Sequence, residues 1–583
     1  MIEKLTSKKN LLIITGLLVC IAFCYPLFSD GLIRGHDTYF HLCRIEALKE
    51  AYLHGDFFPR LYYEQNFNFG YGTPLFYSDI FLIIPALIRI SGVPIVITYK
   101  LFIFFCTCLT FFSMYYVVKK LSQNSYAGFL SAIIYLFTAY RITDVYVRGA
   151  VGEILAMIII PIVVLEIYKV LYTESYSYKL LGVFFGLLLL SHNISFILMC
   201  GVFGIFICCN LKKLWKEKRR IFCIIKAVVL ALGCLAFFLF PMLEQLSSGE
   251  YAINEFVNDS NISNNTLFFE QLFTVKINFG LAGHEFGRDH WMTTNTGLVA
   301  LFLPLLISKI KKSEFDNYSF LLICTVVGYF CLIVCLNIFP WKQLNSLLSF
   351  MQFPWRLVII SSTLLSIVSG IFVMKCRKAL SEKHVLILVS LLVLSIGIYQ
   401  LSFVQHEPTV IFNDTPYSLI ADDDYSGEHG IVTYYNQAEL AAADYLPIKD
   451  NIDYRNYGDY VVTNNKQEFI DFTRAYNNIS FSVESSNAES FYILPLVYYK
   501  GYVVDTYSEI GEYMGSIVPY PDDETYLVTF NPGERNEKIQ YVIYYKGTKL
   551  QSISYGISMV FIFILVFDEI IKKGVKRICC KFQ

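Results

Sequence analysis

The chain has 583 residues, of which 55% are hydrophobic and only 16% are charged, and its mean hydropathy is +0.50. Soluble domains carry about one-quarter charged residues, so this composition excludes an ordinary soluble protein. The net charge of -1 gives no reason to expect a nucleic-acid partner. Apolar runs alternate with short basic clusters, which is typical of a polytopic α-helical membrane protein.

The basic clusters predict how the chain crosses the membrane. Lys and Arg gather in cytoplasmic loops, and two such loops must be separated by an even number of spans. This rule favours about twelve transmembrane helices with both termini in the cytoplasm. It also makes the short apolar stretch 78–92 a re-entrant or interfacial segment. The spans are expected at residues 11–29, 95–118, 125–141, 153–172, 178–190, 193–209, 221–243, 295–310, 319–337, 355–374, 384–404 and 552–571.

Three regions follow from this topology. Residues 1–404 form a transmembrane domain whose first outer loop is 30–94, and residues 551–583 supply a final helix and a basic cytoplasmic tail. Residues 405–550 are polar, and acidic side chains clearly outnumber basic ones there. Apolar and polar residues alternate in several of its segments, so we expect an extracytoplasmic β-sandwich-like domain inserted before the last helix.

The first outer loop carries the most chemistry. Asp37 follows the first helix, at the border between membrane and water, and His41 stands one helical turn later. A carboxylate in such a place can act as a general base toward a hydroxyl, and a nearby imidazole can orient it. The alternative is structural, because Asp also caps helix N-termini.

Other polar groups are predicted at the outer ends of later helices. Arg148 and Glu153 lie near the membrane plane, where charges are costly and usually functional. Arg148 could bind a lipid phosphate, or it could pair with a carboxylate and only fix the turn. His192 either belongs to a site or caps a helix. Gln352 and Arg356 begin another span, where Arg356 either binds phosphate or anchors the helix at the interface.

The order of the motifs resembles that of one bacterial family of membrane proteins. These are the proteins described as 6-pyruvoyl-tetrahydropterin synthase-related, close to the YfhO-like proteins. The resemblance covers nearly the whole chain. The motifs are Asp37-x-x-x-His41, Gly55-Asp-Phe-Phe-Pro-Arg60, Phe69-Gly-Tyr-Gly-Thr-Pro74, Tyr146-Val-Arg-Gly149, Glu153, Ser191-His-Asn193, Gln352-Phe-Pro-Trp-Arg356, Asp444-Tyr-Leu-Pro447 and Leu494-Pro-Leu-Val-Tyr-Tyr-Lys-Gly-Tyr502.

The resemblance implies a GT-C type glycosyltransferase architecture in the bacterial cytoplasmic membrane. Such enzymes transfer a sugar from a polyprenyl-phosphate donor on the outer face of the membrane, here to an envelope glycopolymer or glycolipid. Carried over, the acidic residue of their first outer loop is Asp37, with His41 beside it as a second catalytic candidate. The predicted substrate-binding residues are Arg60, Tyr71, Arg148, Glu153, His192, Gln352 and Arg356.

A metal is not required by this interpretation. Many GT-C enzymes carry two adjacent acids in the first outer loop, whereas His36 and Thr38 flank Asp37 here. We therefore expect no obligatory cofactor and leave a divalent metal open. His284, Asp289 and His290 are possible ligands in a later loop, although a plain surface or a substrate loop is the expected interpretation.

Two functions of other classes compete with the glycosyltransferase. A transporter or flippase of a lipid-linked saccharide would need ionisable groups deep within the spans, and few are present, with Glu166 as the main candidate. A non-catalytic envelope-assembly protein would use the outer domain to bind polymer and would transfer no sugar.

Overall fold

A computed structural model describes most of the chain. The described residues are 8–33, 35–253, 262–280, 291–310, 312, 318–376, 380–407, 409–410, 444–447, 461–463 and 469–579. The chain divides into two compact units. Unit 1 comprises Met1–Leu42, Leu87–Ala231 and Val257–Tyr435, and unit 2 comprises Cys43–Ala86, Leu232–Phe256 and Asn436–Gln583.

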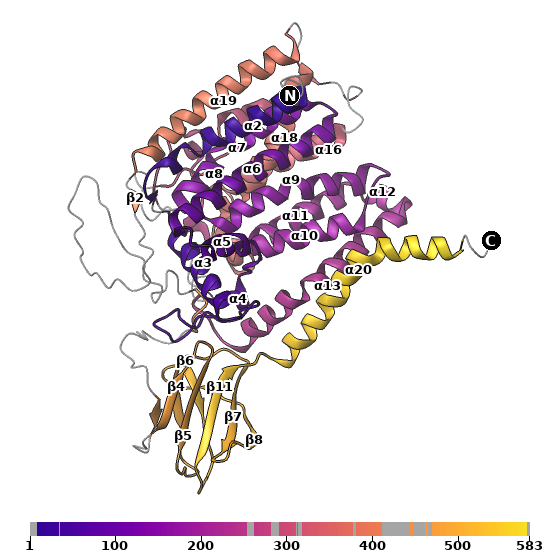
Figure 1. The fold of residues 1–583 in the computed structure, drawn as a ribbon. Helices are drawn as coiled ribbons and strands as arrows, with labels where there is room; N and C mark the ends of the chain where they lie inside the picture. Colours follow the sequence, from indigo (N-terminus) through magenta and orange to yellow (C-terminus); the bar gives the residue numbers. More distant parts are fainter. Residues whose placement is uncertain are drawn as a thin grey trace. The chain divides into compact units, whose positions relative to one another are not determined.

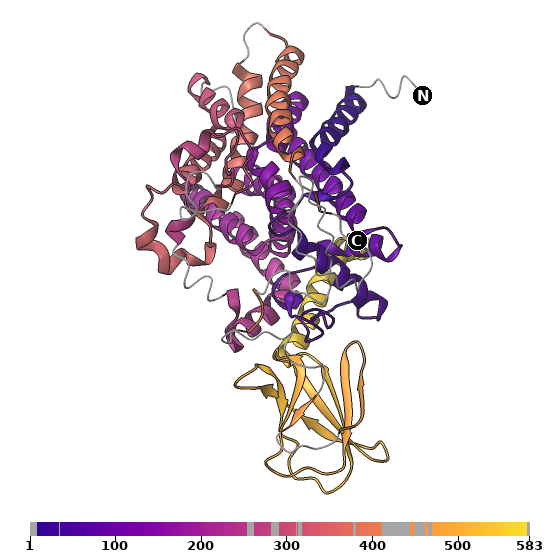
Figure 2. The ribbon, with the colours of Figure 1, turned by 90° about the vertical axis from the view of Figure 1, so that its left-hand side faces the viewer.

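Unit 1 is a helical bundle whose helices pack side by side (Figures 1 and 2). Its helices are α2 (Lys8–Phe23), α6 (Ile95–Ser122), α7 (Ser125–Leu136), α8 (Ala139–Ile142), α9 (Val151–Tyr172), α10 (Tyr178–Ser191), α11 (Asn193–Cys209), α12 (Leu211–Lys216), α15 (Leu298–Phe302), α16 (Tyr318–Val334), α17 (Trp341–Leu348), α18 (Val358–Cys376) and α19 (Glu382–Gln405). A two-residue pair of strands, β1 (Leu32–Ile33) and β2 (Thr409–Val410), also belongs to it.

Close helix packing in unit 1 depends on small residues. A Cβ atom at Gly128 of α7 would lie 2.7 Å from the Tyr115 carbonyl oxygen of α6. On the other side of α7, a Cβ atom at Gly370 of α18 would lie 2.6 Å from the Ala127 carbonyl oxygen. Backbones can approach this closely only where side chains are small, which is how helices associate in membranes. Helices α6, α7 and α18 thus form the centre of the bundle.

Helix α7 and the helical segment that follows it are separated by a sharp bend. Phe137 and Thr138 end the regular part, and the segment Ala139–Arg148 leaves at an angle of 53° to Ser125–Leu136. The last part, Thr143–Arg148, is a wide π-helical turn that ends at Gly149, whose φ is +65°. Such turns often occur at functional sites, and this one places Arg148 at the end of the bent segment.

Unit 2 contains a β-sandwich. Strands β4 (Ile470–Arg474), β5 (Asn478–Val483), β11 (Ile539–Tyr545), β7 (Tyr502–Ser508) and β8 (Tyr513–Ile517) form one antiparallel sheet in that order. Strands β3 (Val462–Thr463), β6 (Tyr492–Val497), β10 (Leu527–Phe530) and β9 (Tyr520–Pro521) form the other.

Four aromatic side chains from the two sheets form the centre of the sandwich. Phe481 and Tyr541 come from the five-stranded sheet and Tyr492 and Phe530 from the four-stranded one, and all are at most 1% exposed. The rings of Tyr492 and Phe530 are 5.3 Å apart, and those of Tyr492 and Tyr541 are 5.9 Å apart. The predicted β-rich domain is therefore present, with described strands between residues 462 and 545.

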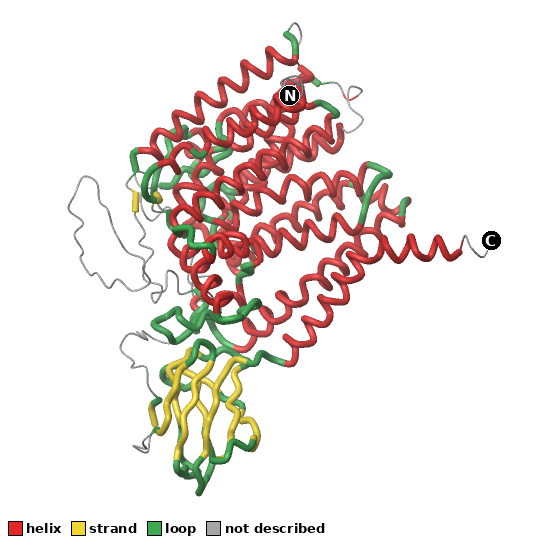
Figure 3. The backbone as a smooth tube through the Cα atoms, viewed as in Figure 1, coloured by secondary structure: helices red, strands yellow, loops and turns green. Residues whose placement is uncertain are grey.

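Helices also belong to unit 2. Helix α20 (Lys549–Cys579) follows the sandwich and runs beside the second half of α13 (Lys218–Ser248) (Figures 1 and 3). Ser558 Oγ donates to the Gly233 carbonyl oxygen at 3.1 Å and accepts from the Phe237 amide at 2.8 Å. Helix α4 (Thr73–Phe76) is short, and the border between the units crosses α3 (Thr38–Leu53), α5 (Ile83–Ile90) and α13.

Every predicted span coincides with a helical segment, but their number as crossings is not confirmed. Among the described residues, six helices are long and apolar enough to cross a membrane, or seven if the bent pair counts as one span. Several expected spans are shorter apolar helices, among them α10, α11 and α16. The expected span 295–310 is split between α15 and a 3₁₀ turn. The count of twelve and the sidedness therefore stay predictions. Most of residues 405–460 lie outside the described part.

Candidate functional site

Asp37 is held against the turn that carries Arg148. The His36 amide donates to the Val147 carbonyl oxygen at 3.1 Å, and the Asp37 amide donates to the Arg148 carbonyl oxygen at 2.6 Å. Gly149 follows with its positive φ, which a residue with a side chain adopts only at a cost. Two backbone segments far apart in the sequence are therefore fixed to one another at this point.

The Asp37 carboxyl group interacts electrostatically with nearby basic side chains. Its backbone carbonyl oxygen accepts from the His41 amide at 3.1 Å, so α3 begins here. Within the described part of the chain, the carboxylate itself accepts no hydrogen bond, so the geometry does not show side-chain capping. Burial raises the pKa of Asp37 above its ordinary value, and the positive charges of Arg148, His36 and Arg356 oppose the rise.

Arg148 is the centre of a buried ion-pair network. Its Nη1 lies 2.7 Å from Asp144 Oδ1 and 2.8 Å from Glu153 Oε1. The Tyr140 hydroxyl donates to the other Glu153 oxygen. The guanidinium also lies 4.6 Å from the centre of the Trp355 ring, within cation–π range. The ion-pair interpretation of Arg148 is confirmed, while phosphate binding by this residue stays a prediction.

Arg356 is held more loosely. Its Nη1 donates to Gln352 Oε1 at 2.6 Å and to the Met351 carbonyl oxygen at 3.0 Å, whereas its Nε lies 3.4 Å from Glu153 Oε1. Gln352 has a φ of 60°, a conformation that residues with side chains seldom adopt. Mostly neutral partners therefore fix the Arg356 guanidinium, and its charge stays available to an anion.

His192 caps a helix and lies close to the same charges. It joins α10 to α11, and its Nδ1 accepts from the Ser195 amide at 3.3 Å. The capping interpretation is thus confirmed. Glu153 and Arg356 are both near enough to act electrostatically on the imidazole. His192 therefore stands at the edge of the charged cluster as well.

The structure brings together only part of the predicted set. Asp37, Arg148, Glu153, His192 and Arg356 meet in unit 1, with Gln352 behind Arg356. We call the group Asp37, Asp144, Arg148, Glu153, His192 and Arg356 the charged cluster. Arg34, which belongs to the same outer loop as Asp37, lies outside the described residues.

The other predicted residues have different surroundings. His41 is buried in the first turn of α3, with its ring edge-on to Phe40 at 5.1 Å, and the role of its ring stays a prediction. Arg60 and Tyr71 belong to unit 2. Arg60 donates to the Phe237 carbonyl oxygen at 2.9 Å, and Tyr71 is 1% exposed. Their contacts within unit 2 give no support for substrate binding.

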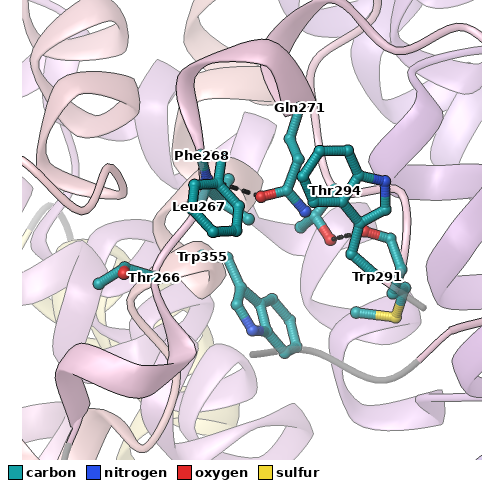
Figure 4. A pocket seen from close by; sticks show the side chains of 8 residues that line it. Thr266, Leu267, Phe268, Gln271, Trp291, Thr294 and Trp355 are labelled. Atoms are coloured by element: carbon teal, nitrogen blue, oxygen red, sulfur yellow. Dashed lines mark hydrogen bonds between the residues drawn. The ribbon is translucent and has the colours of Figure 1, made fainter. Parts of the chain in front are cut away.

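An aromatic pocket adjoins the charged cluster through Trp355 (Figure 4). It is small, with about 10 Å³ of free space, which is about enough for one water molecule. Gln271 in its wall accepts from the Phe268 amide at 2.7 Å, which fixes that loop. The lining residues are Thr266, Leu267, Phe268, Gln271, Trp291, Met292, Thr294 and Trp355.

Sequence reasoning missed two groups of polar residues. Arg141 is fully buried in α8 and donates to the Ile154 carbonyl oxygen at 3.0 Å. Glu50, His54 and Glu64 place three ligand atoms within 4.8 Å of one another in unit 2. The spacing of four residues between Glu50, in the last turn of α3, and His54, just after the helix, was the available signal. The earlier metal candidates at 284, 289 and 290 lie outside the described residues.

Comparisons with known proteins agree with a membrane protein. The family model described as "6-pyruvoyl-tetrahydropterin synthase related domain; membrane protein" matches residues 75–404, more than half of the chain. An uncharacterised protein of Lactococcus lactis subsp. cremoris (strain MG1363) is 24% identical over 341 residues, which are 56% of this chain. The match covers 53% of that protein, so the chain spans about half of its length.

Two solved structures of mycobacterial arabinofuranosyltransferase AftD were also found. One has a TM-score of 0.44 at 13% identity and covers 67% of this chain and 27% of AftD. The other, of an AftD variant, has a TM-score of 0.37 at 14% identity and covers 67% and 28%.

Proposed function

Because the chain belongs to the family of 6-pyruvoyl-tetrahydropterin synthase-related membrane proteins, we propose that the charged cluster gives it a glycosyltransferase activity in the membrane. The donor is a polyprenyl-phosphate-linked sugar, and the acceptor is a hydroxyl of an envelope glycopolymer or glycolipid. Transfer takes place on the outer face of the bacterial cytoplasmic membrane.

The observation that carries the proposal is the position of Asp37. Its carboxylate accepts no hydrogen bond among the described residues, yet the guanidinium groups of Arg148 and Arg356 are near enough to interact with it electrostatically. A general base must be free to take a proton. A reaction that releases a phosphate anion needs positive charge that is already in place. The cluster supplies both at one point.

The chemical step follows from these two groups. Asp37 removes the proton of the acceptor hydroxyl while its oxygen attacks the anomeric carbon. The bond from that carbon to the phosphate oxygen breaks, and the lipid phosphate leaves with the bonding electrons. Attack from the face opposite to the phosphate inverts the anomeric configuration. No group of the protein is consumed, and Asp37 returns its proton to water.

The two arginines have different tasks in this mechanism. Arg148 is already paired with two carboxylates, so it contributes a fixed positive charge and holds the Asp37 backbone. Arg356 has mostly neutral partners, so it binds the departing phosphate. An electrostatic donor of this kind is worth on the order of 3–4 kcal/mol in the transition state.

The experiment is a transfer assay with the full-length protein in membranes and a series of polyprenyl-phosphate sugars. Asp37→Asn should fold and lower the rate by about 10²–10⁴-fold, as expected for loss of a general base. The matched control is Asp30→Asn, because Asp30 is an exposed acid of the same loop. Its rate should stay that of the wild type.

Equal transfer rates for wild type and Asp37→Asn would disprove the proposal. Binding of lipid-linked sugars without transfer by the wild type would also do so. It would favour a transporter or a non-catalytic assembly protein instead.

A further inference from the structure

Three side chains of metal-binding type meet at the end of α3, within unit 2. Glu50 lies in the last turn of the helix, His54 follows the helix end, and Glu64 comes from the next loop. One possible ligand atom from each lies within 4.8 Å of the other two. Among the described residues, this is the one group of three such side chains with that spacing.

The imidazole of His54 is fixed in the orientation that a metal ligand needs. Its Nδ1 lies 2.9 Å from the Glu50 carbonyl oxygen, so Nδ1 carries the hydrogen and donates it. Nε2 is then the nitrogen whose lone pair can bind a cation. Metal-binding histidines almost always donate their second ring nitrogen in this way.

Tyr476 fixes the plane of the same ring. The Tyr476 ring, from the turn between β4 and β5, stacks on His54 with centroids 4.2 Å apart and an angle of 3° between the planes. The stacked pair leaves the edge of the imidazole, where Nε2 lies, uncovered by Tyr476. A rotation of His54 would lose both the stacking and the Nδ1 hydrogen bond.

The two carboxylates converge from separate backbone segments. Glu50 precedes His54 by four residues, which puts both side chains on one helix face. Lys49 Nζ lies 2.9 Å from Glu50 Oε1, so the second carboxylate oxygen of Glu50 remains as a ligand for a cation. Glu64 belongs to a loop closed by the pairing of Tyr62 with Tyr71. Like charges repel at such a short distance, and a cation between them removes the repulsion.

We propose that Glu50, His54 and Glu64 bind a divalent transition-metal ion, with Zn²⁺ as the best match. Zinc sites with three protein ligands combine imidazole and carboxylate and keep water at the fourth position. Ligand atoms around tetrahedral zinc stand about 3.4 Å apart, as follows from metal–ligand distances of about 2.1 Å. Closure from 4.8 Å needs only small rotations of the Glu side chains. Mg²⁺ and Ca²⁺ favour oxygen ligands alone and more of them.

The bound ion ties the end of α3 to the loop around Glu64 and, through Tyr476, to the sandwich. Its ligands belong to unit 2, whereas the charged cluster belongs to unit 1, and the ion takes no part in the proposed transfer reaction.

Zinc binding to the full-length protein in detergent tests the proposal. The protein is stripped with a chelator, dialysed and titrated with ZnCl₂, by calorimetry and by thermal unfolding. Wild type should bind one equivalent at micromolar or lower concentration, and its midpoint temperature should rise, since a ligand of the folded state stabilises it. Glu64→Gln and His54→Gln should each weaken binding at least tenfold.

Matched variants separate a site from incidental binding. Tyr476→Phe keeps the stacked ring and should bind zinc like wild type, whereas Tyr476→Leu should bind several-fold more weakly. His406→Gln removes another exposed histidine and should have no effect. Lys49→Gln removes the competing ammonium and should strengthen binding. Wild-type affinity in both His54→Gln and Glu64→Gln, or binding only at millimolar zinc, would overturn the proposal.

Discussion

Arg148 Nη1 lies 2.8 Å from Glu153 Oε1. Arg148 ends the π-helical turn and Glu153 lies in the first turn of α9, and only Gly149 and Ala150 separate the two elements. The same nitrogen lies 2.7 Å from Asp144. Both carboxylates are almost completely buried, so this one guanidinium is the ion-pair partner of two acidic side chains that water hardly reaches. Each charge is acceptable there only because the other partners are present.

Removal of the Arg148 charge should therefore destabilise the fold around the charged cluster, and this loss of stability is its main effect. Arg148→Met leaves Asp144 and Glu153 without their cation, and loss of one partner of a buried pair costs about 3–5 kcal/mol. We expect a marked fall in the thermal midpoint of the detergent-solubilised protein. Glu153→Gln in the same chain should restore part of the loss. A double variant no more stable than Arg148→Met would show that the pair is not coupled.

The acid limb of the pH–rate profile should reflect the ionisation of the Asp37 carboxyl group. Burial raises the pKa of this carboxyl, and a base works only when ionised. Transfer should therefore fall, as the pH is lowered, at a pH above the value of about 3.9 of an ordinary aspartate. The measurement is kcat/KM against pH for a soluble acceptor. A profile flat down to pH 4 would contradict this assignment.

Arg356 provides an independent check of the same group. Its positive charge holds the pKa of Asp37 down, so Arg356→Gln should move the acid limb to higher pH as well as slow transfer. Arg356→Lys keeps the charge and should leave the limb in place, even if transfer slows because the lysine lacks the planar fork that matches phosphate. An acid limb at the same pH in both variants would show that the charge of Arg356 does not influence the pKa of Asp37.

Hydropathy and charge predicted the helices well, because a membrane span needs about 20 apolar residues whatever it packs against. The expected segments 178–190 and 193–209 correspond to α10 and α11 almost to the residue. The alternation of apolar and polar residues within 405–550 likewise predicted a β-rich domain, and β5 is one of its strands. The bend of 53° after Leu136 could not be predicted, since no proline marks it and local backbone geometry decides it.

The candidate site was predictable only in part. Arg148, Glu153 and Arg356 were found because a charge near the membrane plane is costly and therefore visible in the sequence. Arg60 was named from a motif, which gives a residue type without its partners, so its substrate-binding role stays a prediction. Glu50, His54 and Glu64 were missed, because their meeting depends on how the loop after α3 folds back.

Gly149 should tolerate no side chain. A Cβ atom there would lie 2.1 Å from Thr38 Oγ1 and 3.0 Å from the Thr38 amide nitrogen, and the φ of +65° itself disfavours alanine. Gly149→Ala should push the start of α3 away from the turn, weaken the Asp37 contact and lower kcat strongly. Gly92→Ala is the control, because a Cβ atom at this glycine, also at positive φ, would meet nothing within 4 Å. It should cost about 1–2 kcal/mol in stability and leave kcat unchanged.

Substitutions at Arg60 and Tyr555 can distinguish a structural role of Arg60 from the substrate-binding role that its motif predicts. Its Nε donates to the Tyr555 hydroxyl at 2.5 Å and its Nη2 to the Phe237 carbonyl oxygen, so within unit 2 it joins α20 to α13. Arg60→Met should lower the thermal midpoint, because it removes both contacts and leaves the carbonyl of a helix without its extra donor. Tyr555→Phe should lower the midpoint less, because the ring under the guanidinium remains.

A substrate-binding role would give a different result. In that case Arg60→Met would raise KM for the lipid-linked donor, measured well below the unfolding temperature, while Tyr555→Phe left KM unchanged. We expect KM to stay at the wild-type value in both variants.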